Sequence, residues 1–239
     1  MKNQKLFINY AHRGASEYAP ENTFLSFYLG VSMGANGIET DVQITKDGVP
    51  VLFHDDTLFR VTGEKGSVCD YTLSELKEFW VKKGELKDKI VTLEDFLEHF
   101  KDMDLTFAIE LKSDGSSKPT ADLVRKYDLK NKVIITSFKY KELIDFKKYA
   151  PEFTAGYLAT EIDENLLKQM KEDGIEELCP EAKDITKALV KEWKTLGFSV
   201  RAWGVYNVDL MKSAIDAGVD GMTVNFPNKL TEHLKEENL

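Results

Sequence analysis

The sequence predicts an α/β fold, a (β/α)8 TIM barrel that forms a single domain over residues 1–239. Short apolar stretches of strand length alternate with amphipathic stretches of helix length, the pattern of a parallel sheet with helices outside it. About eight such units fit into the chain, which has the length typical of these barrels. Strand–helix turns carry no GxGxxG or GxxxxGK[ST] pattern, which disfavours an open nucleotide-binding sheet.

The expected elements follow one another along most of the chain. The first helix begins near Pro20, with Asn22 or Thr23 as its N-cap, and ends near Met33 before two glycines. A Lys46-Asp47-Gly48 turn separates the second and third strands. The expected strands are 6–11, 38–44, 49–53, 105–112, 133–137, 154–158, 177–179, 199–203 and 221–224; later helices are 92–100, 118–127, 140–149, 163–172, 184–196, 207–217 and 227–234.

The alternation of strands and helices stops between about residues 56 and 90. This stretch is polar, contains several glycines, and has one amphipathic helix that we expect at Leu73–Trp80. Long loops without secondary structure are uncommon in compact domains. We therefore predict a small insertion that lies over one end of the barrel.

Acidic side chains interrupt the apolar pattern of two expected strands. Side chains alternate between the two faces of a strand, so Glu39 and Asp41 share one face while Ile38 and Val42 share the other. The strand TFAIELK places Glu110 away from its apolar face in the same way. Exposure of that face to solvent would readily explain acidic side chains in one such strand, but it is a poor explanation for two. Because an apolar outer face packs against helices, we expect these acids inside the barrel.

Three carboxylates, those of Glu39, Asp41 and Glu110, predict an all-oxygen metal site. Such a site suits a hard divalent cation, Mg²⁺ or Ca²⁺, whose remaining ligands are waters or substrate. Zinc is disfavoured because it prefers histidine or thiolate ligands.

Two histidines and two cations occur at strand ends, where barrel enzymes place their active sites. His12 and His54 each close an extended stretch, and imidazoles suit general acid–base catalysis near neutral pH. Arg13 and Lys112 supply positive charge for an anion such as phosphate. This set suits metal-assisted cleavage of a phosphodiester, in which one histidine accepts a proton and the other protonates the leaving alkoxide. The sequence leaves open which histidine has which task.

Three strings in the chain resemble a known enzyme family. HRGASEYAPENT, IETDVQITKDGVPVLFHDD and IELK, in this order, are similar to the motifs of the glycerophosphodiester phosphodiesterases. Ser137-Phe138, a strand that ends at Trp203, and DGMTVNFP near the C-terminus fit the same family. The resemblance covers essentially the whole chain.

The resemblance implies a barrel with an insertion after the HD motif, here residues 56–90. It also implies metal-dependent hydrolysis of glycerophosphodiesters to glycerol 3-phosphate and an alcohol. Carried over, metal ligands fall on Glu39, Asp41 and Glu110, acid–base histidines on His12 and His54, and phosphate contacts on Arg13 and Lys112. Glu21 and Asn22 are expected to brace the loop after the first strand. Trp203 is expected either to pack against the glycerol moiety or to lie in the core.

Two stretches depart from the family pattern. Trp203-Gly204-Val205-Tyr206 replaces a Trp-Thr-Val-Asn-like run, and Thr223-Val224-Asn225 stands where a Thr-Asp pair is common. We expect both to shape the substrate site and neither to touch the catalytic set. They therefore bear on the identity of the substrate more than on the reaction.

Composition limits the partners of the protein. The formal net charge of −9 disfavours nucleic-acid binding and stable association with anionic membranes. It does not exclude a small anionic substrate, since a metal ion and a few cations can reverse the field inside one cleft. Cys69 and Cys179 form no metal-binding spacing, and residues 1–5 are too short for a signal peptide. With no apolar run of membrane-helix length, these features predict a cytoplasmic protein of unknown oligomeric state.

Two alternatives remain beside the soluble phosphodiesterase. The same site could act on a lysophospholipid or another lipid phosphodiester, which requires an exposed apolar rim. The insertion offers Leu58, Phe59, Leu76, Phe79 and Trp80, but the helical spacing of the last three favours core packing. The second alternative is a non-catalytic barrel that binds glycerol phosphates. It is disfavoured because all the expected histidines and carboxylates are present.

Overall fold

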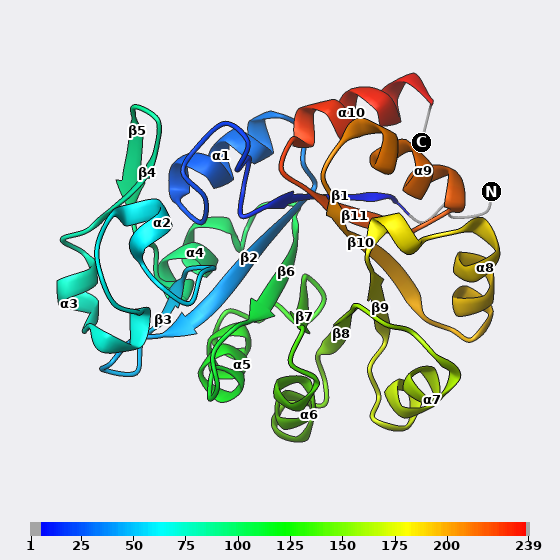
Figure 1. Ribbon diagram of the computed structural model, residues 1–239. Coiled ribbons are helices and arrows are strands. Elements are labelled where there is room, and N and C mark those ends of the chain that lie inside the picture. The colour runs from blue at the N-terminus through cyan, green and yellow to red at the C-terminus, as the bar shows by residue number, and fades with distance from the viewer. Residues whose placement is uncertain (1–5, 238–239) are drawn as a thin grey trace.

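The structure of the protein is a computed structural model that describes residues 6–237. Within these residues, eight parallel strands form a closed barrel, because β1 pairs with both β2 and β11. Helices surround the strands, as Figure 1 shows, so the predicted (β/α)8 barrel is confirmed. In order around the barrel, the strands are β1 (Ile8–His12), β2 (Gly37–Ile44), β6 (Thr106–Leu111), β7 (Val133–Ser137), β8 (Thr154–Ala159), β9 (Glu177–Pro180), β10 (Ser199–Val205) and β11 (Gly221–Val224).

The helices on the outside follow the expected alternation. The first begins after Thr23, whose side chain accepts a hydrogen bond from the backbone N–H of Ser26, so Thr23 rather than Asn22 is the N-cap. The outer helices are α1 (Phe24–Ser32), α4 (Leu93–Phe100), α5 (Ser117–Lys126), α6 (Tyr140–Tyr149), α7 (Glu164–Glu172), α8 (Lys187–Thr195), α9 (Val208–Ala217) and α10 (Pro227–Glu236). A short 3₁₀ helix, η2 (Ala182–Asp184), precedes α8.

The main apolar core lies between the barrel and these helices. Phe96 of α4 packs edge-on against Phe107 of β6 and Phe27 of α1, with ring centroids 5.4 and 4.9 Å apart. Ile38 and Val42 of β2 are fully buried in the same cluster. With one face of β2 packed against the helices, its alternate residues point into the barrel.

The stretch expected as a third strand at 49–53 does form a strand, but it does not join the parallel barrel. Strand β3 (Pro50–Leu52) pairs antiparallel with β2, so that Leu52 lies opposite Val42. The tight turn before it reverses the chain direction. β3 therefore runs back along β2, from the carboxyl end of β2 toward its amino end, and places His54 beside the barrel.

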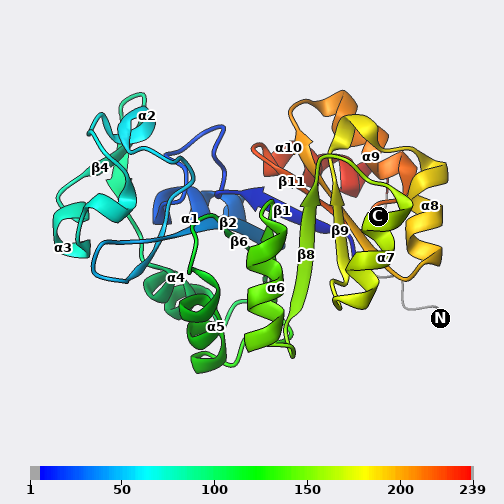
Figure 2. The ribbon, with the colours of Figure 1, turned by 60° about the horizontal axis from the view of Figure 1, so that its bottom comes forward.

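The segment after His54 has its own small elements and its own apolar cluster. They are α2 (Phe59–Thr62), η1 (Val68–Asp70), α3 (Leu73–Leu76), β4 (Trp80–Lys83) and β5 (Leu86–Lys89), the last two paired as an antiparallel hairpin. Figure 2 shows them beside α1 at one side of the molecule, away from α7 and α8. The expected helix Leu73–Trp80 is wrong in length, because it ends at Leu76 and Trp80 begins a strand.

The apolar cluster of this segment shows which of its apolar residues are buried and which are exposed. Leu58 and Leu76 are fully buried there together with Val51 and Phe53, and Phe79 packs against them. Phe59 is exposed, and the exposed ring of Trp80 is covered by the ammonium groups of Lys87 and Lys89. Leu58, Leu76 and Phe79 of the candidate lipid-binding rim are thus part of this cluster, whereas the expected core packing of Trp80 is wrong. The division of the chain into one domain with an insertion stays a prediction.

Among residues 6–237, none of the helices is both long enough and apolar enough to pass through a bilayer.

Candidate active site

A cavity of about 280 Å³ opens at the carboxyl ends of the barrel strands. Barrel enzymes place their chemistry at this end, because the loops after the strands converge there. Six of the residues expected from the sequence line the cavity: His12, Arg13, Glu39, His54, Glu110 and Trp203. The four other expected residues, Glu21, Asn22, Asp41 and Lys112, contact members of this group, as described below.

The three expected metal ligands lie together. One ligand oxygen from each of Glu39, Asp41 and Glu110 can be chosen so that all three lie within 4.8 Å of one another. Asp41 and Glu110 are opposite each other in the β2–β6 pairing, and Glu39 is one inward-facing position earlier on β2. All three side chains are buried, and Asp41 Oδ1 has no hydrogen-bond partner among the residues that the structure describes. A buried, unpartnered carboxylate oxygen is costly unless a cation approaches it.

The electrostatics of the three carboxylates also fit a cation. Burial and then the neighbouring charge of Asp41 raise the pKa of Glu110 to about 7. The same two causes, in the same order, raise the pKa of Glu39 well above its usual value. Burial would raise the pKa of Asp41 as well, but Arg13, His54 and Lys112, with the hydrogen bond from Asn22, together outweigh it and lower this pKa. The acidic groups could therefore hold a metal ion, and their all-oxygen character suits a hard one.

Both expected cations neutralise part of this acidic cluster. Arg13 Nε lies 3.2 Å from Asp41 Oδ2, and Arg13 Nη1 donates to Glu21 Oε1 at 3.0 Å. Lys112 Nζ lies 3.2 Å from Glu110 Oε1. Arg13 has a left-handed backbone (φ 54°), and its N–H bonds back to the carbonyl of Glu39 on β2. This left-handed turn at Arg13 thus places the guanidinium next to Asp41 and Glu21 rather than away from them.

Asn22, expected to brace the loop after β1, reaches the carboxylates directly. It is buried with φ 55°, a left-handed conformation that asparagine adopts more readily than most residues. Its Nδ2 donates to Asp41 Oδ2 at 2.9 Å, and its Oδ1 accepts from Thr40 Oγ1 at 2.7 Å. Asn22 therefore fixes the orientation of the Asp41 carboxylate as well as the loop.

His12 is held by a residue that the sequence interpretation placed outside the catalytic set. Its Nδ1 is hydrogen-bonded to Oδ1 of Asn225, which also accepts from Ser16 Oγ at 3.1 Å. The expectation that Thr223–Asn225 touches no catalytic residue is thus wrong, because β11 is a neighbour of β1 and Val224 pairs with Ala11, so that the next residues, Asn225 and His12, lie side by side. With Nδ1 directed at an oxygen, His12 Nε2 is 3.8 Å from Glu39 Oε2. Burial and the charge of Arg13 keep the pKa of His12 well below its usual value.

His54 is held differently, by a carboxylate. Its Nδ1 lies 2.7 Å from Asp55 Oδ1, and Asp55 in turn bonds Arg60 of α2. Gln43, the third inward residue of β2, donates to the carbonyls of Phe53 and Asp55 and so holds the backbone on both sides of His54. The sequence analysis named neither Asp55 nor Arg60 as a site residue. The HD dipeptide was a signal for the first, whereas Arg60 lies in a short helix within a polar stretch that shows no periodicity.

Trp203 lines the cavity together with two other aromatic residues. Its ring meets Phe138 edge-on with centroids 4.9 Å apart, and its Nε1 donates to the Ala159 carbonyl at 3.4 Å. Tyr206 also lines the cavity and is 67% exposed. Trp203 is therefore in a place where it can contact a substrate.

A second group of polar residues, which the sequence analysis did not predict, lies in the barrel interior close to the cavity. Arg201 of β10 is buried, donates to Glu177 at 3.1 Å and Thr223 at 2.8 Å, and contacts the thiol of Cys179. The pattern of β10 could have revealed it, because a charged residue alternates with apolar ones in SVRAW. Its full burial, however, depends on partners from two other strands.

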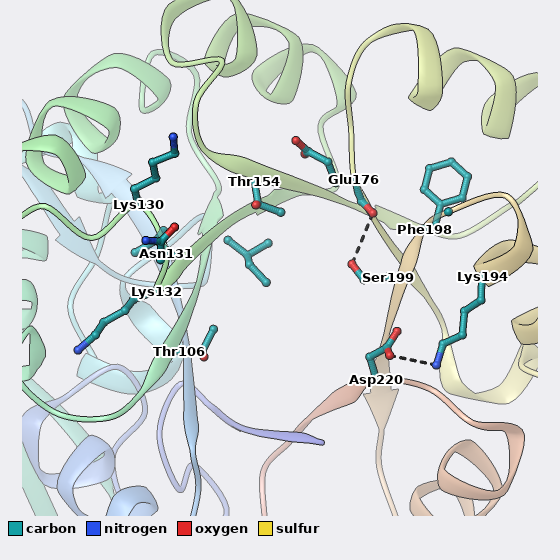
Figure 3. A pocket seen from close by; sticks show the side chains of 13 residues that line it. Thr106, Lys130, Asn131, Lys132, Thr154, Glu176, Lys194, Phe198, Ser199 and Asp220 are labelled. Atoms are coloured by element: carbon teal, nitrogen blue, oxygen red, sulfur yellow. Dashed lines mark hydrogen bonds and ion pairs between the residues drawn. The ribbon is translucent and has the colours of Figure 1, made fainter. Parts of the chain in front are cut away.

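Another cavity, of about 670 Å³, lies at the amino ends of the strands (Figure 3). Three of its charged side chains are used in local contacts: Lys194 pairs with Asp220 at 3.0 Å, and Lys132 donates to two backbone carbonyls. Ser199 donates to the Glu176 carbonyl. This end of such barrels serves stability rather than chemistry.

Comparison with known proteins agrees with the arrangement at the carboxyl ends. The model of the glycerophosphoryl diester phosphodiesterase family matches residues 12–229. A curated relative from Caldanaerobacter subterraneus subsp. tengcongensis, named glycerophosphodiester phosphodiesterase, is 36% identical over 230 residues, which cover 92% of this chain and 94% of the relative.

Solved structures share the whole fold. The crystal structure of a putative glycerophosphoryl diester phosphodiesterase from Silicibacter pomeroyi superposes with a TM-score of 0.90, at 24% identity, covering 99% of this chain and 96% of the other. An Oleispira antarctica phosphodiesterase, solved in complex with the product sn-glycerol-3-phosphate, has a TM-score of 0.83 at 26% identity, covering 95% of this chain and 96% of the other. The match of a family model across most of the chain shows that the protein belongs to the glycerophosphoryl diester phosphodiesterase family.

Proposed function

We propose that the protein hydrolyses glycerophosphodiesters to glycerol 3-phosphate and an alcohol with the help of a divalent cation. The observation that carries this proposal is the grouping of Glu39, Asp41 and Glu110 at a cavity that two histidines also line. The related Oleispira phosphodiesterase was solved with sn-glycerol-3-phosphate as its product, which supports the same product here.

Glu39, Asp41 and Glu110 would hold the cation, which we propose to be Mg²⁺ or Ca²⁺. When bound, it supplies positive charge that stabilises a phosphoryl group and makes a hydroxyl group easier to deprotonate. Asn22 keeps the Asp41 carboxylate in place for this task.

The partners of the two histidines support different roles for them. Burial and the nearby charge of Arg13 lower the pKa of His12 and favour its uncharged ring, whose Nδ1 is hydrogen-bonded to the amide oxygen of Asn225. Its free Nε2 can accept a proton from the attacking hydroxyl. His54 Nδ1 faces the Asp55 carboxylate, an anionic partner of the kind that suits a histidine acting as a general acid. We therefore assign the general base to His12 and the general acid, which protonates the leaving alcohol, to His54.

Positive and aromatic side chains complete the substrate site. Arg13 and Lys112 can contact phosphate oxygens, Arg13 through its planar fork and Lys112 as a single charge. Trp203 offers an apolar surface at the cavity wall for the glycerol moiety. Glu21 holds the Arg13 guanidinium at 3.0 Å.

The direct test is the release of glycerol 3-phosphate from glycerophosphocholine and glycerophosphoethanolamine. The protein would be treated with EDTA, dialysed, and assayed again with Mg²⁺ or Ca²⁺. We expect no release without metal and recovery with one of the two cations. The variants His12→Ala and His54→Ala should each lower kcat by about 10² or more, because positioned acid–base catalysis contributes that much.

The controls separate the proposal from its alternatives. His99→Ala, at an exposed residue of α4, should keep wild-type turnover. Release from a lysophospholipid, but from neither glycerophosphodiester, would replace the proposed substrate with a lipid. Wild-type turnover in both histidine variants would refute the mechanism. Binding of glycerol 3-phosphate without turnover under any metal condition would identify a binding protein.

The remaining expectations about the setting of the protein stay predictions. The acidic chain is proposed to work in the cytoplasm on a small molecule, without nucleic acid and without stable membrane association.

A further inference from the structure

The segment after His54 reaches the candidate active site through Arg60 of the short helix α2. Its guanidinium forms four hydrogen bonds to carboxylates on two different loops. Nε and Nη2 donate to Asp55 at 2.5 and 2.8 Å. Nη1 and Nη2 donate to Glu21 at 2.8 and 2.7 Å. Since the guanidinium is planar and both carboxylates bind it in a bidentate manner, the two loops are fixed relative to each other.

Each of these carboxylates also holds a residue of the proposed catalytic set. Asp55 accepts from His54 Nδ1 at 2.7 Å, and Glu21 accepts from Arg13 Nη1 at 3.0 Å. The contacts thus form one continuous series, His54–Asp55–Arg60–Glu21–Arg13. Arg60 is its middle member, and it comes from neither of the two loops that it joins.

The backbone that carries Arg60 is itself well anchored. Leu58 and Val61, on either side of it, are buried in the cluster that also contains Phe53, the residue directly before His54. Gly63 ends α2 with a left-handed backbone, φ 84°. The packing of this segment and the placement of His54 therefore depend on the same apolar cluster.

The Arg60 side chain is 51% exposed, and a single ion pair at such a site contributes little. Four hydrogen bonds in two bidentate pairs are a different case, since their geometry adds directional restraint to the charge attraction. Burial would raise the pKa of Asp55, yet the hydrogen bonds from Arg60 and His54 lower it to about 2. Glu21, His54 and Asp55 also offer ligand atoms within 4.8 Å of one another, but the Arg60 guanidinium already supplies the positive charge there.

We propose that Arg60 is a positioning residue for the reaction. It holds Asp55 so that His54 keeps its Nδ1 on the carboxylate and its Nε2 available to the cavity. Through Glu21 it steadies Arg13 on the other side of the same cavity. This inference rests on the proposed function, in which His54 is the general acid.

The test compares Arg60→Ala and Arg60→Lys with the wild type. Steady-state kcat and KM for glycerophosphocholine would be measured with saturating metal. We expect Arg60→Ala to lower kcat by about tenfold or more, a part of the roughly 10²-fold or larger contribution of a positioned acid. KM should change less than about threefold, because Arg13 keeps its own contacts with Glu21 and Asp41. Arg60→Lys, which keeps the charge but loses the fork, should recover part of kcat.

A second measurement follows His54 without relying on turnover. The imidazole ¹⁵N NMR signals of the metal-free protein report which ring nitrogen carries the proton, and His54→Ala identifies the His54 signals. In the wild type we expect His54 Nδ1 to keep its proton both in the neutral ring and in the imidazolium, and in Arg60→Ala we expect a mixture of Nδ1–H and Nε2–H tautomers of the neutral ring. Arg125→Ala is the matched control, since this partly exposed arginine of α5 pairs with Glu152 of the turn after α6, on the outside of the barrel.

The outcomes separate the inference from the proposed function. A wild type without turnover would refute the proposed function, while the NMR comparison would still test the coupling of Arg60 to His54. An active wild type whose kcat and His54 signals are unchanged in Arg60→Ala would overturn the inference. Reduced kcat with unchanged His54 signals would also overturn it, because Arg60 would then act by another route. If Arg60→Ala does not fold, the same criteria apply to Arg60→Lys.

Discussion

Asp41 of β2 and Glu110 of β6 are direct partners in the parallel pairing of two neighbouring strands, and both side chains point into the barrel. This register places two buried carboxylates next to each other in a protein interior. Their repulsion, added to burial, raises the pKa of Glu110 to about 7 in the metal-free protein.

Metal affinity should therefore depend on pH near neutrality. Below about pH 7 a proton occupies Glu110 and competes with the cation, so affinity for Mg²⁺ or Ca²⁺ should rise between pH 6 and pH 8. Binding near pH 7 should release protons. Isothermal titration calorimetry in buffers of different ionisation enthalpy measures both effects. In Glu110→Gln the release assigned to this residue should disappear; equal affinity of the wild type at both pH values would contradict the prediction.

Replacing the amide partner of His12 by a carboxylate should change how this histidine titrates. Asn225 Oδ1 faces His12 Nδ1, so Asn225→Asp would place a negative charge beside the ring and raise its pKa. If His12 is the general base, the acidic limb of the kcat/KM profile should move to higher pH. Asn228→Asp, whose side chain bonds Tyr18 instead, is the control and should leave the profile in place. An unmoved acidic limb in Asn225→Asp would argue against His12 as the base.

The two cysteines should differ sharply in reactivity. Cys69 is exposed, whereas burial raises the pKa of Cys179 well above its usual value beside Glu177 and Arg201. Because the thiolate is the reactive form, a thiol reagent such as DTNB should modify one cysteine in the folded protein and both after denaturation. In Cys69→Ser the folded protein should show no fast reaction. Two fast thiols in the folded wild type would contradict the burial of Cys179.

Removing the buried arginine of the barrel should be costly. Arg201→Met leaves Glu177 buried without the guanidinium that now bonds it at 3.1 Å. Losing one partner of a buried ion pair costs about 3–5 kcal/mol, so the free energy of unfolding should fall by that amount. Urea denaturation measures it. Arg125→Met, at a surface pair, should change the same quantity by about 1 kcal/mol or less.

The fold and most of the site were predictable because they depend on local patterns. Alternation of apolar and amphipathic stretches predicts the barrel, and acids on the inner faces of two strands predict the carboxylate group. Strand alternation alone places Glu39, Asp41 and Glu110 inside, and the closed barrel brings them together. The antiparallel direction of β3 follows from the short Lys46-Asp47-Gly48 turn, because parallel strands need a much longer connection, but the apolar pattern of the strand alone does not give it.

The residues that sequence reasoning missed act through contacts distant along the chain. Asn225 meets His12 across 213 positions, and Arg60 meets Glu21 across 39. Arginine is usually an exposed residue, and the burial of Arg201 becomes evident only when its hydrogen bonds to Glu177 and Thr223 are known. Such contacts depend on how the barrel closes and on how the segment after His54 packs beside it, which no periodicity in one segment encodes.

The antiparallel pairing of β3 with β2 determines which changes in the chain would move His54. His54 is located by hydrogen bonds to β2, through the Phe53 N–H on the Asp41 carbonyl at 3.0 Å and the Gln43 amide on the Phe53 and Asp55 carbonyls. In a hairpin, the turn type and the loop length fix the register of the pairing. The turn at 46–48 can therefore be exchanged only for one that keeps this register, with Leu52 opposite Val42 and Phe53 bonded to Asp41. A slip of one residue in the pairing would instead displace His54 by about 3.4 Å and turn it to the other face of the hairpin.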